Sequence, residues 1–426
     1  MEHRRLRLLF LIVAVFAFLV IVWYFFFAAP KEAPTLTDTA NPLPVTSLPA
    51  RFAFIFSSNT KNNAPATSTE TEVTDPTQEP FIEVWDKPTT GNMFTARSYL
   101  KQVSATSTSG TTTTTVTKTV RATSTTLLFV DRTTGYIYGH NIESGTTYQI
   151  SNTTLPGIYD AYIFGDRVLM RYLDEDRKTI LSILANIPSV GETDDAKPLI
   201  NINTLPKNIS SVAVNQSHTE ASYVVPNDNG ASVYTVTPKG ISTVASSPFA
   251  EWLLSYGGNQ LYATTKASAY IEGITASLPS FARVLGGKTG LTTLGGTSYL
   301  LHSMWSASGL LTFSTKGNET HMFNVQTLAA KCAQINQSFV CGVPKDLPET
   351  TEGLPDDWYQ GSVSFDDTLQ VLDPSTGQST SFYTFPEKFG AFDVTSLQTN
   401  PSGEALSFIR KQDGKLFLLR TNLLGD

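Results

Sequence analysis

Short strand patterns recur along this chain from residue 127 onward, at intervals of about 40–50 residues. Each marker is rich in β-branched, aromatic or other apolar residues, and turn sequences rich in Gly, Asp and Asn separate the markers. The seven markers are residues 136–138, 179–181, 232–234, 269–271, 320–323, 368–371 and 415–417. Repeats of about this length, built from short strands, are typical of propeller blades. We therefore predict an all-β fold, a β-propeller of about seven four-stranded blades, with six or eight blades as alternatives.

Two other architectures explain the pattern less well. A doubly wound α/β fold needs helices of about 10–15 residues between its strands, and residues 328–334 are the best short helix candidate after residue 30. Tandem sandwiches of the immunoglobulin type, each of about 100 residues, would also cover the length and are the second choice.

The two ends of such a propeller must meet for its core to be complete. A stack of sheets buries every face except the outer faces of its first and last members, so the stack has to close into a ring. The last blade supplies three strand patterns, at residues 392–397, 406–409 and 416–419. We expect its outer strand to come from the N-terminal side, from residues 81–85 or, as the alternative, from residues 52–56.

Residues 400–422 read NPSGEALSFIRKQDGKLFLLRTN, which is a turn, a strand, a second turn and a second strand. This segment resembles the repeat of the TolB-type and WD40-like propellers of bacterial envelopes. Further segments look like a widespread group of uncharacterised, membrane-anchored bacterial propeller proteins: residues 131–145, 150–157, 171–174, 341–344 and 354–361. The resemblance covers residues 81–426, implies a single-pass envelope protein, and carries over no catalytic residue.

The N-terminus carries the pattern of a membrane anchor. Arg4, Arg5 and Arg7 precede residues 8–29, which are 22 residues without a charge. At a rise of about 1.5 Å per residue, a helix of this length spans a bilayer core. The basic flank favours a cytoplasmic tip at residues 1–7. This predicts a single-pass protein of the cytoplasmic membrane, with the C-terminal domain outside, in the bacterial periplasm or at the cell surface.

Two aromatic residues, Trp23 and Tyr24, lie near the outer end of this segment, where such rings favour the membrane interface. A cleaved signal peptide is the alternative, but its apolar region is normally about 7–15 residues long. A cleavage site after Ala29 would also place Phe27 where a small residue is preferred. We therefore predict a signal anchor that stays attached.

The chain between the anchor and the propeller is polar and rich in proline. Residues 30–80 contain eight prolines among Thr, Ser, Asn and Glu, a composition that buries too little apolar surface to fold. We predict a disordered linker there and place the propeller at residues 81–426. Within it, residues 104–126 hold 16 Ser or Thr, which predicts either a flexible excursion or an extended hairpin tip.

Charge and cysteine content restrict the partners. The formal net charge of −7, with no basic cluster beyond the N-terminus, argues against nucleic acid. In an exported chain, Cys332 and Cys341 predict a disulfide, with two buried free thiols as the alternative. The five histidines are not spaced as ligands, and no other metal motif is present, so we predict no metal and no cofactor.

One loop region is a candidate for binding. Trp358 and Tyr359 follow a Pro-rich, acidic stretch and stand beside Asp356 and Asp357. Tryptophan and tyrosine dominate interface hot spots, so this aromatic pair predicts a surface anchor for a partner. The alternative is that Trp358 packs between blades as a core residue.

These observations predict a membrane-anchored, extracytoplasmic binding or scaffold protein. Besides the lipid bilayer that holds its anchor, its partner would be an envelope protein or a glycan, engaged through one face of the propeller. The alternative is a glycan or peptide hydrolase or lyase that uses acidic residues near the central channel. Glycosidases need two carboxylates about 5–10 Å apart. Because adjacent acidic residues such as those at 194–195 and 366–367 mostly cap turns, we assign no catalytic residue.

Overall fold

The computed structural model describes residues 79–109, 112–266, 268–348 and 353–424, with the backbone alone at residues 99–122. The expected tip, membrane helix and most of the linker lie outside the described residues, as do residues 52–56 and the predicted anchor residues Arg4, Arg5, Arg7, Trp23 and Tyr24. Among the residues that are described, no helix is both long enough and apolar enough to cross a membrane.

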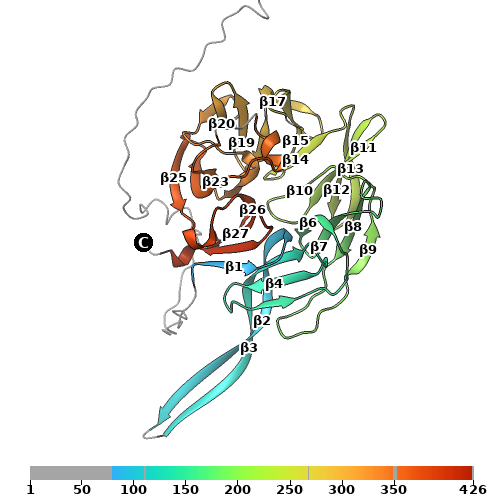
Figure 1. The fold of residues 1–426 in the computed structure, drawn as a ribbon. Coiled ribbons are helices and arrows are strands. Elements are labelled where there is room, and N and C mark those ends of the chain that lie inside the picture. Colours follow the sequence, from blue (N-terminus) through green and yellow to red (C-terminus); the bar gives the residue numbers. More distant parts are fainter. Residues whose placement is uncertain (1–78, 110–111, 267, 349–352, 425–426) are drawn as a thin grey trace, which may run out of the picture. The chain divides into compact units, whose positions relative to one another are not determined.

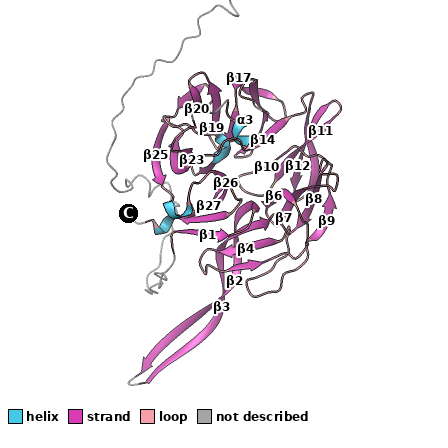
Figure 2. Cartoon of the chain, in the orientation of Figure 1, coloured by secondary structure: helices cyan, strands magenta, loops and turns pink. Residues whose placement is uncertain are grey.

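Strands dominate the described chain and form seven four-stranded sheets (Figure 2). Blade 1 consists of β2 (Thr89–Ser109), β3 (Thr112–Asp131), β4 (Ile137–Asn141) and β5 (Thr147–Gln149). Blade 2 consists of β6 (Ile158–Phe164), β7 (Arg167–Leu173), β8 (Ile180–Asn186) and β9 (Ile200–Thr204). Blade 3 consists of β10 (Ser211–Val214), β11 (Ala221–Asn227), β12 (Gly230–Thr237) and β13 (Gly240–Ser247). Blade 4 consists of β14 (Trp252–Gly257), β15 (Gln260–Thr265), β16 (Glu272–Ser277) and β17 (Ala282–Thr289). Blade 5 consists of β18 (Thr292–Gly295), β19 (Leu300–Ser306), β20 (Gly309–Lys316) and β21 (Glu319–Met322). Blade 6 consists of β22 (Cys332–Ile335), β23 (Ser338–Pro344), β24 (Asp367–Asp373) and β25 (Gln378–Tyr383). Blade 7 consists of β26 (Val394–Thr399), β27 (Ala405–Arg410), β28 (Leu416–Arg420) and β1 (Phe81–Trp85). The helical elements are short: η2 (Ala329–Lys331), α3 (Asp356–Gln360), η3 (Glu387–Phe389) and η4 (Thr421–Leu423).

The first strands of the blades lie around a common centre (Figure 1). Contacts link β2 to β6, β6 to β10, β10 to β14 and β14 to β18. Further along the chain, β22 contacts β26, and β26 contacts β2, so blade 7 meets blade 1. The sheets therefore close into a ring. The prediction of an all-β propeller with seven four-stranded blades is confirmed.

The strand that completes blade 7 comes from the N-terminal side of the domain. β1 pairs antiparallel with β28, with Phe81 opposite Leu419. The backbone N–H of Arg420 donates a hydrogen bond to the carbonyl of Pro80 at 2.7 Å, which continues the pairing beyond the strand. The prediction that residues 81–85 close the ring is therefore confirmed.

The alternation of side chains along β1 explains why it fits between two blades, because successive residues of a strand point to opposite faces. Phe81 packs in a cluster shared by blades 6 and 7, where its ring stacks on that of Phe417 at 5.5 Å. Ile82 packs in a second cluster, shared by blades 7 and 1. A bulge between Glu83 and Trp85 shifts the register, and Trp85 joins this second cluster.

Two of the seven sequence markers are wrong in detail, although five lie in third strands as a regular repeat requires. Residues 269–271 belong to the loop before β16, where the backbone N–H of Ala269 bonds to a distant carboxylate, Asp356 Oδ2, at 2.9 Å. Residues 320–323 belong mainly to the outer strand β21 rather than to β20. The expected short helix at residues 328–334 is a single 3₁₀ turn, η2, that leads directly into β22.

Of the Ser/Thr-rich residues 104–126, those described, 104–109 and 112–126, lie in the hairpin of β2 and β3 (Figure 1). Its pairing runs from Thr89 opposite Asp131 to Ser109 opposite Thr112, and no irregularity follows Asn92. The backbone therefore takes the extended-hairpin alternative. Threonine tolerates this arrangement because its β-branched side chain favours strand geometry.

We expect Phe81→Ala to lower the free energy of unfolding by about 3–5 kcal/mol, because Phe81 is 4% exposed and its loss would leave a cavity at the ring closure. Chemical denaturation followed by tryptophan fluorescence would measure the effect. Glu83→Gln in the same strand is the control, since its ion pair with Lys415 is partly exposed and should contribute less than about 1 kcal/mol. Equal effects of the two substitutions would contradict the assigned role of Phe81.

Candidate functional site

A cavity of about 580 Å³ occupies the centre of the ring. The first strands of all seven blades line it, together with several of the turns that follow those strands. Its uncharged polar lining residues include Asn92, Tyr162, Gln216, Ser255, Thr297, Gln334 and Gln398. A concave site with convergent polar groups is the first place to expect a ligand.

Ionisable groups are rare in the described lining. Asp160 is its one carboxylate, and the guanidinium of Arg171 binds both carboxylate oxygens, with 2.6 Å between Nε and Oδ1. His218 is its one histidine, and burial lowers the pKa of this imidazole. The described lining therefore offers hydrogen-bonding groups that are mostly neutral.

Side chains from three blades meet at one end of the cavity. Gln334 of blade 6 accepts a hydrogen bond from Thr297 N at 2.8 Å and donates one to Thr297 Oγ1 at 2.9 Å. Gln216 of blade 3 donates to the same Gln334 oxygen. His218 and Asn336, in the turns beside this group, both have the left-handed backbone angle φ 51°. Non-glycine residues seldom adopt this conformation, and those that do cluster at functional sites.

The first strands of three neighbouring blades are irregular where they line the cavity. Bulges interrupt β2, β6 and β26 next to Asn92, Asp160 and Ser396, respectively. The amide of Asn92 donates hydrogen bonds to Ser396 O at 3.1 Å and to Ser407 Oγ at 2.8 Å, which links blades 1 and 7. Bulges change the direction of side chains and are frequent beside functional sites.

The predicted binding residues Asp356, Asp357, Trp358 and Tyr359 lie together on α3, in the connection between β23 and β24. In an antiparallel blade, the connection after the second strand lies at the end opposite the connection after the first. The group of Gln216, Thr297 and Gln334 belongs to the other end. None of the four predicted residues lines the cavity.

Each of these four residues has a distinct environment. Trp358 is buried, with 4% of its surface exposed, so it is the core residue that the sequence allowed as an alternative. The carboxylate of Asp356 accepts the N–H of Ala269, and that of Asp357 accepts the N–H of Gly353 at 3.0 Å. Tyr359 is 51% exposed and remains available as a surface contact.

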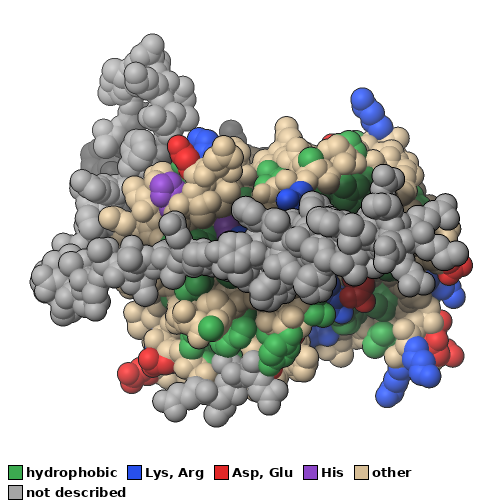
Figure 3. Space-filling view, turned by 90° about the horizontal axis from the view of Figure 1, so that it is seen from above, with side chains coloured by type: hydrophobic (Ala, Val, Ile, Leu, Met, Phe, Trp, Pro, Cys, Tyr) green, Lys and Arg blue, Asp and Glu red, His purple; other side chains and the backbone are tan. Residues whose placement is uncertain are grey.

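The contact of Asp356 with Ala269 brings α3 against the loop between β15 and β16. That loop exposes Tyr270 by 73% and Ile271 by 64%, the two highest values among the large apolar residues described. We call Tyr270, Ile271 and Tyr359 the aromatic corner. In the view of Figure 3, acidic and basic side chains lie next to one another along the right edge of the molecule.

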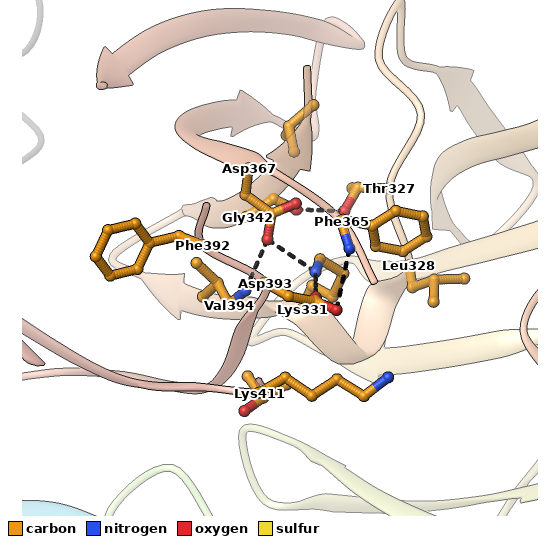
Figure 4. A network of polar contacts seen from close by, with 12 residues as sticks. Thr327, Leu328, Lys331, Gly342, Phe365, Asp367, Phe392, Asp393, Val394 and Lys411 are labelled. Carbon is orange, nitrogen blue, oxygen red and sulfur yellow. Dashed lines mark hydrogen bonds and ion pairs between the residues drawn. The ribbon is translucent and has the colours of Figure 1, made fainter. Parts of the chain in front are cut away.

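A buried ionic cluster, which sequence reasoning missed, lies beneath α3 between blades 6 and 7 (Figure 4). Lys331 Nζ lies 2.8 Å from Asp367 Oδ2 and also contacts Asp393 Oδ1, and all three side chains are fully buried. The Trp358 indole N–H donates to Asp393 at 2.9 Å. Burial raises the pKa of Asp367 to about 6, although Lys331 opposes this shift. The one sequence signal is a lysine within the apolar run at residues 328–335.

Among the residues that the structure describes, which exclude His3, no group of three or more potential metal ligands occurs. His140 and His302 are buried, and the loss of hydration lowers their pKa values to about 4 and about 3. Cys332 and Cys341 form a disulfide between directly opposite positions of β22 and β23.

No family model matches the sequence, and no curated protein matches it significantly. Solved propellers resemble the fold. The β-propeller domain of the Trilobed protease from Pyrococcus furiosus has 10% identity and a TM-score of 0.43, over 76% of this chain and 95% of that one. The WD40 domain of Neurospora crassa Pan2 has 10% identity and a TM-score of 0.41, over 69% of this chain and 85% of that one.

An oligogalacturonate lyase in complex with manganese has 8% identity and a TM-score of 0.44, over 77% of this chain and 98% of that one. At such low identity these similarities concern the fold alone. The strand pairing described above defines the seven-bladed propeller, and no activity is transferred from these proteins.

We expect the stability of the domain to fall as the pH drops below about 6.5, in part because of His302. The pKa of this imidazole is about 3 in the folded state and about 6.5 in an unfolded chain, so the unfolded state binds the proton first. The contribution of neutral His302 to the free energy of unfolding is complete above pH 6.5. It decreases toward pH 3 by up to about 1.4 kcal/mol per pH unit. His302→Phe should make the pH dependence shallower between pH 6 and 4, measured by denaturation at each pH. An unchanged slope would contradict this role.

Proposed function

We propose that this protein is a binding protein whose central cavity holds a neutral, hydroxyl-rich ligand such as the end of a glycan chain. The observation that carries the proposal is the lining, to which every blade contributes and whose polar side chains are mostly carboxamides and hydroxyls. Each carboxamide both donates and accepts hydrogen bonds, as a sugar hydroxyl does. A charged ligand would lack a free counterion in the described lining, because Asp160 is already paired with Arg171.

The group of Gln216, Thr297 and Gln334 supports the same ligand class. Their mutual hydrogen bonds hold the polar atoms at one end of the cavity in fixed positions before a ligand arrives. Groups that are already oriented lose less conformational entropy on binding. A ligand hydroxyl would replace one of these contacts, because it can both donate and accept a hydrogen bond.

Binding is better supported than the alternative of glycan hydrolysis. A glycosidase needs two carboxylates about 5–10 Å apart, of which one acts as the acid. Asp160 is the one carboxylate in the described lining, and both its oxygens are engaged by Arg171. This geometry supports a cavity that binds a glycan without cleaving it.

A second candidate contact is the aromatic corner, which fits a protein partner of the cell envelope. Tyr270, Ile271 and Tyr359 present large apolar surface at the other end of the blades, and tyrosines are common interface hot spots. Asp356 and Asp357 support this corner by fixing the backbone at Ala269 and Gly353.

We further propose that residues 8–29 anchor the chain in the cytoplasmic membrane, with the propeller outside. The length and basic flank of this segment support the anchor. The Cys332–Cys341 disulfide is consistent with an oxidising compartment, where such bonds persist. The resemblance of residues 400–422 to TolB-type repeats supports an envelope role.

We expect Gln334→Ala to weaken binding of a neutral oligosaccharide at least about tenfold, because the substitution removes a hydrogen-bond donor and an acceptor from the cavity lining. Calorimetry with a panel of neutral and acidic oligosaccharides would measure it. Neutral members should bind best, and their affinity should change little with salt. Gln337→Ala is the matched control, since Gln337 is exposed and outside the cavity lining.

The same panel separates the two candidate contacts. Tyr359→Ser should leave oligosaccharide binding unchanged, because Tyr359 lies at the other end of the blades and outside the cavity lining. Preference for acidic oligosaccharides, or equal losses in the Gln334 and Gln337 variants, would contradict the proposed cavity ligand.

We expect Cys332 and Cys341 to resist thiol alkylation in cells, even after the protein is denatured, until a reductant is added. An exported chain keeps this disulfide, whereas a cytoplasmic chain would be reduced. Mass spectrometry after alkylation of denatured cell extracts, with and without reductant, would measure the free thiols. Full alkylation without reductant would contradict the proposed placement outside the membrane.

A further inference from the structure

The buried ionic cluster contains the reactants for a covalent cross-link between two blades. Lys331 ends η2, just before the first strand of blade 6, and Asp393 immediately precedes the first strand of blade 7. Asp367 opens β24. We propose that Lys331 and Asp393 form an intramolecular isopeptide bond, with Asp367 acting as the proton carrier.

The surroundings of Lys331 favour a product that carries fewer charges. All three side chains are fully buried, and aromatic rings cover the amine, with the ring centroid of Phe365 at 4.8 Å and that of Trp358 at 5.2 Å from Nζ. Keeping one ammonium and two carboxylates away from water is costly, even when they are paired. An amide between Lys331 and Asp393 removes one positive and one negative charge from this site.

Asp393 is held as the electrophile. Its carboxylate accepts hydrogen bonds from the Trp358 indole N–H at 2.9 and 3.0 Å and from the backbone N–H of Phe365 at 3.2 Å. The hydroxyl of Ser364 donates a further bond at 3.2 Å. These fixed donors would stabilise the negative charge that develops on the carboxyl oxygens when Nζ attacks Cγ.

Asp367 is arranged to move the proton. Its Oδ2 lies 2.8 Å from Lys331 Nζ and accepts the backbone N–H of Val394 at 2.7 Å, whereas its Oδ1 is buried without a hydrogen-bond partner. Burial raises the pKa of this carboxyl to about 6, which suits a group that accepts and returns a proton near neutral pH.

The reaction balances without any co-reactant. The Lys331 ammonium gives one proton to Asp367, and the neutral Nζ attacks Cγ of Asp393 to form the new N–C bond. One carboxyl oxygen of Asp393 takes the proton held by Asp367 and a second proton from the attacking nitrogen. The C–O bond breaks, water leaves, and Asp367 is again a carboxylate.

An exposed ion pair in the same blade gives a matched comparison. Lys345 Nζ lies 2.7 Å from Asp366 Oδ2, but these side chains are 41% and 43% exposed. Water stabilises both charges there, and no aromatic shell excludes it. The Lys331 site therefore differs from this pair in its burial, and not in the distance between lysine and aspartate.

Mass spectrometry of the purified full-length protein tests the proposal. After reduction and denaturation, the intact mass should be lower than the sequence mass by one water molecule. A tryptic digest should contain a branched peptide joining Lys331 to Asp393, and trypsin should not cleave after Lys331. An unchanged mass with normal cleavage after Lys331 would overturn the proposal, and a branch at Asp367 would overturn the assigned roles.

Variants separate the chemistry from simple ion pairing. Lys331→Met should show the full mass, and Asp367→Asn should reduce the cross-linked fraction at least about tenfold, in line with the loss of an acid–base group. Lys345→Met is the control and should keep the loss of one water. Complete cross-linking in Asp367→Asn would overturn its role as proton carrier. The wild-type digest remains decisive if the Lys331 variant does not fold.

Discussion

The pairing of β1 with β28 is the interaction on which the rest of the structure depends. Every other blade is built from consecutive strands, so its four strands form from one stretch of chain. Blade 7 instead joins strands separated by more than three hundred residues of sequence. When this pairing forms, the clusters around Phe81 and Ile82 bury the surfaces of blades 6, 7 and 1 together. Without it, two apolar faces would remain in water.

The junction between blades 6 and 7 also carries a fully buried ionic cluster. Blades 6 and 7 meet around Phe81 at their outer side and around Lys331, Asp367 and Asp393 beneath α3. An apolar contact tolerates small displacements of one blade against the other, whereas buried charges require fixed distances. The ionic cluster therefore adds fixed distances between blades 6 and 7 to their apolar contact.

The sequence predicts the ring because the third strands repeat with apolar residues at regular intervals, and the closing strand because blade 7 lacks a fourth member. It misplaces the markers at residues 269–271 and 320–323, whose composition resembles that of a third strand. Residues 269–271 instead form a loop that contacts Asp356, and residues 320–323 lie mainly in the outer strand β21. The cavity has no such signal: three of the seven first strands that line it are bulged, and their neutral residues resemble those of turns. Likewise, Lys331, Asp367 and Asp393 come from three separate segments, so their meeting follows only from the tertiary fold. Trp358 shows the limit most clearly, because its indole N–H donates to Asp393, a residue 35 positions away in the sequence.

The position of β1 also has a mechanical consequence. A pull applied at Pro80, just before β1, loads this strand first, because β1 is the first paired segment described. A force along the axis of β1 loads its hydrogen bonds to β28 together, in shear, whereas a force across the strand would break them one after another. The direction of tension therefore decides whether the pairing of β1 with β28 resists the force or separates one hydrogen bond at a time.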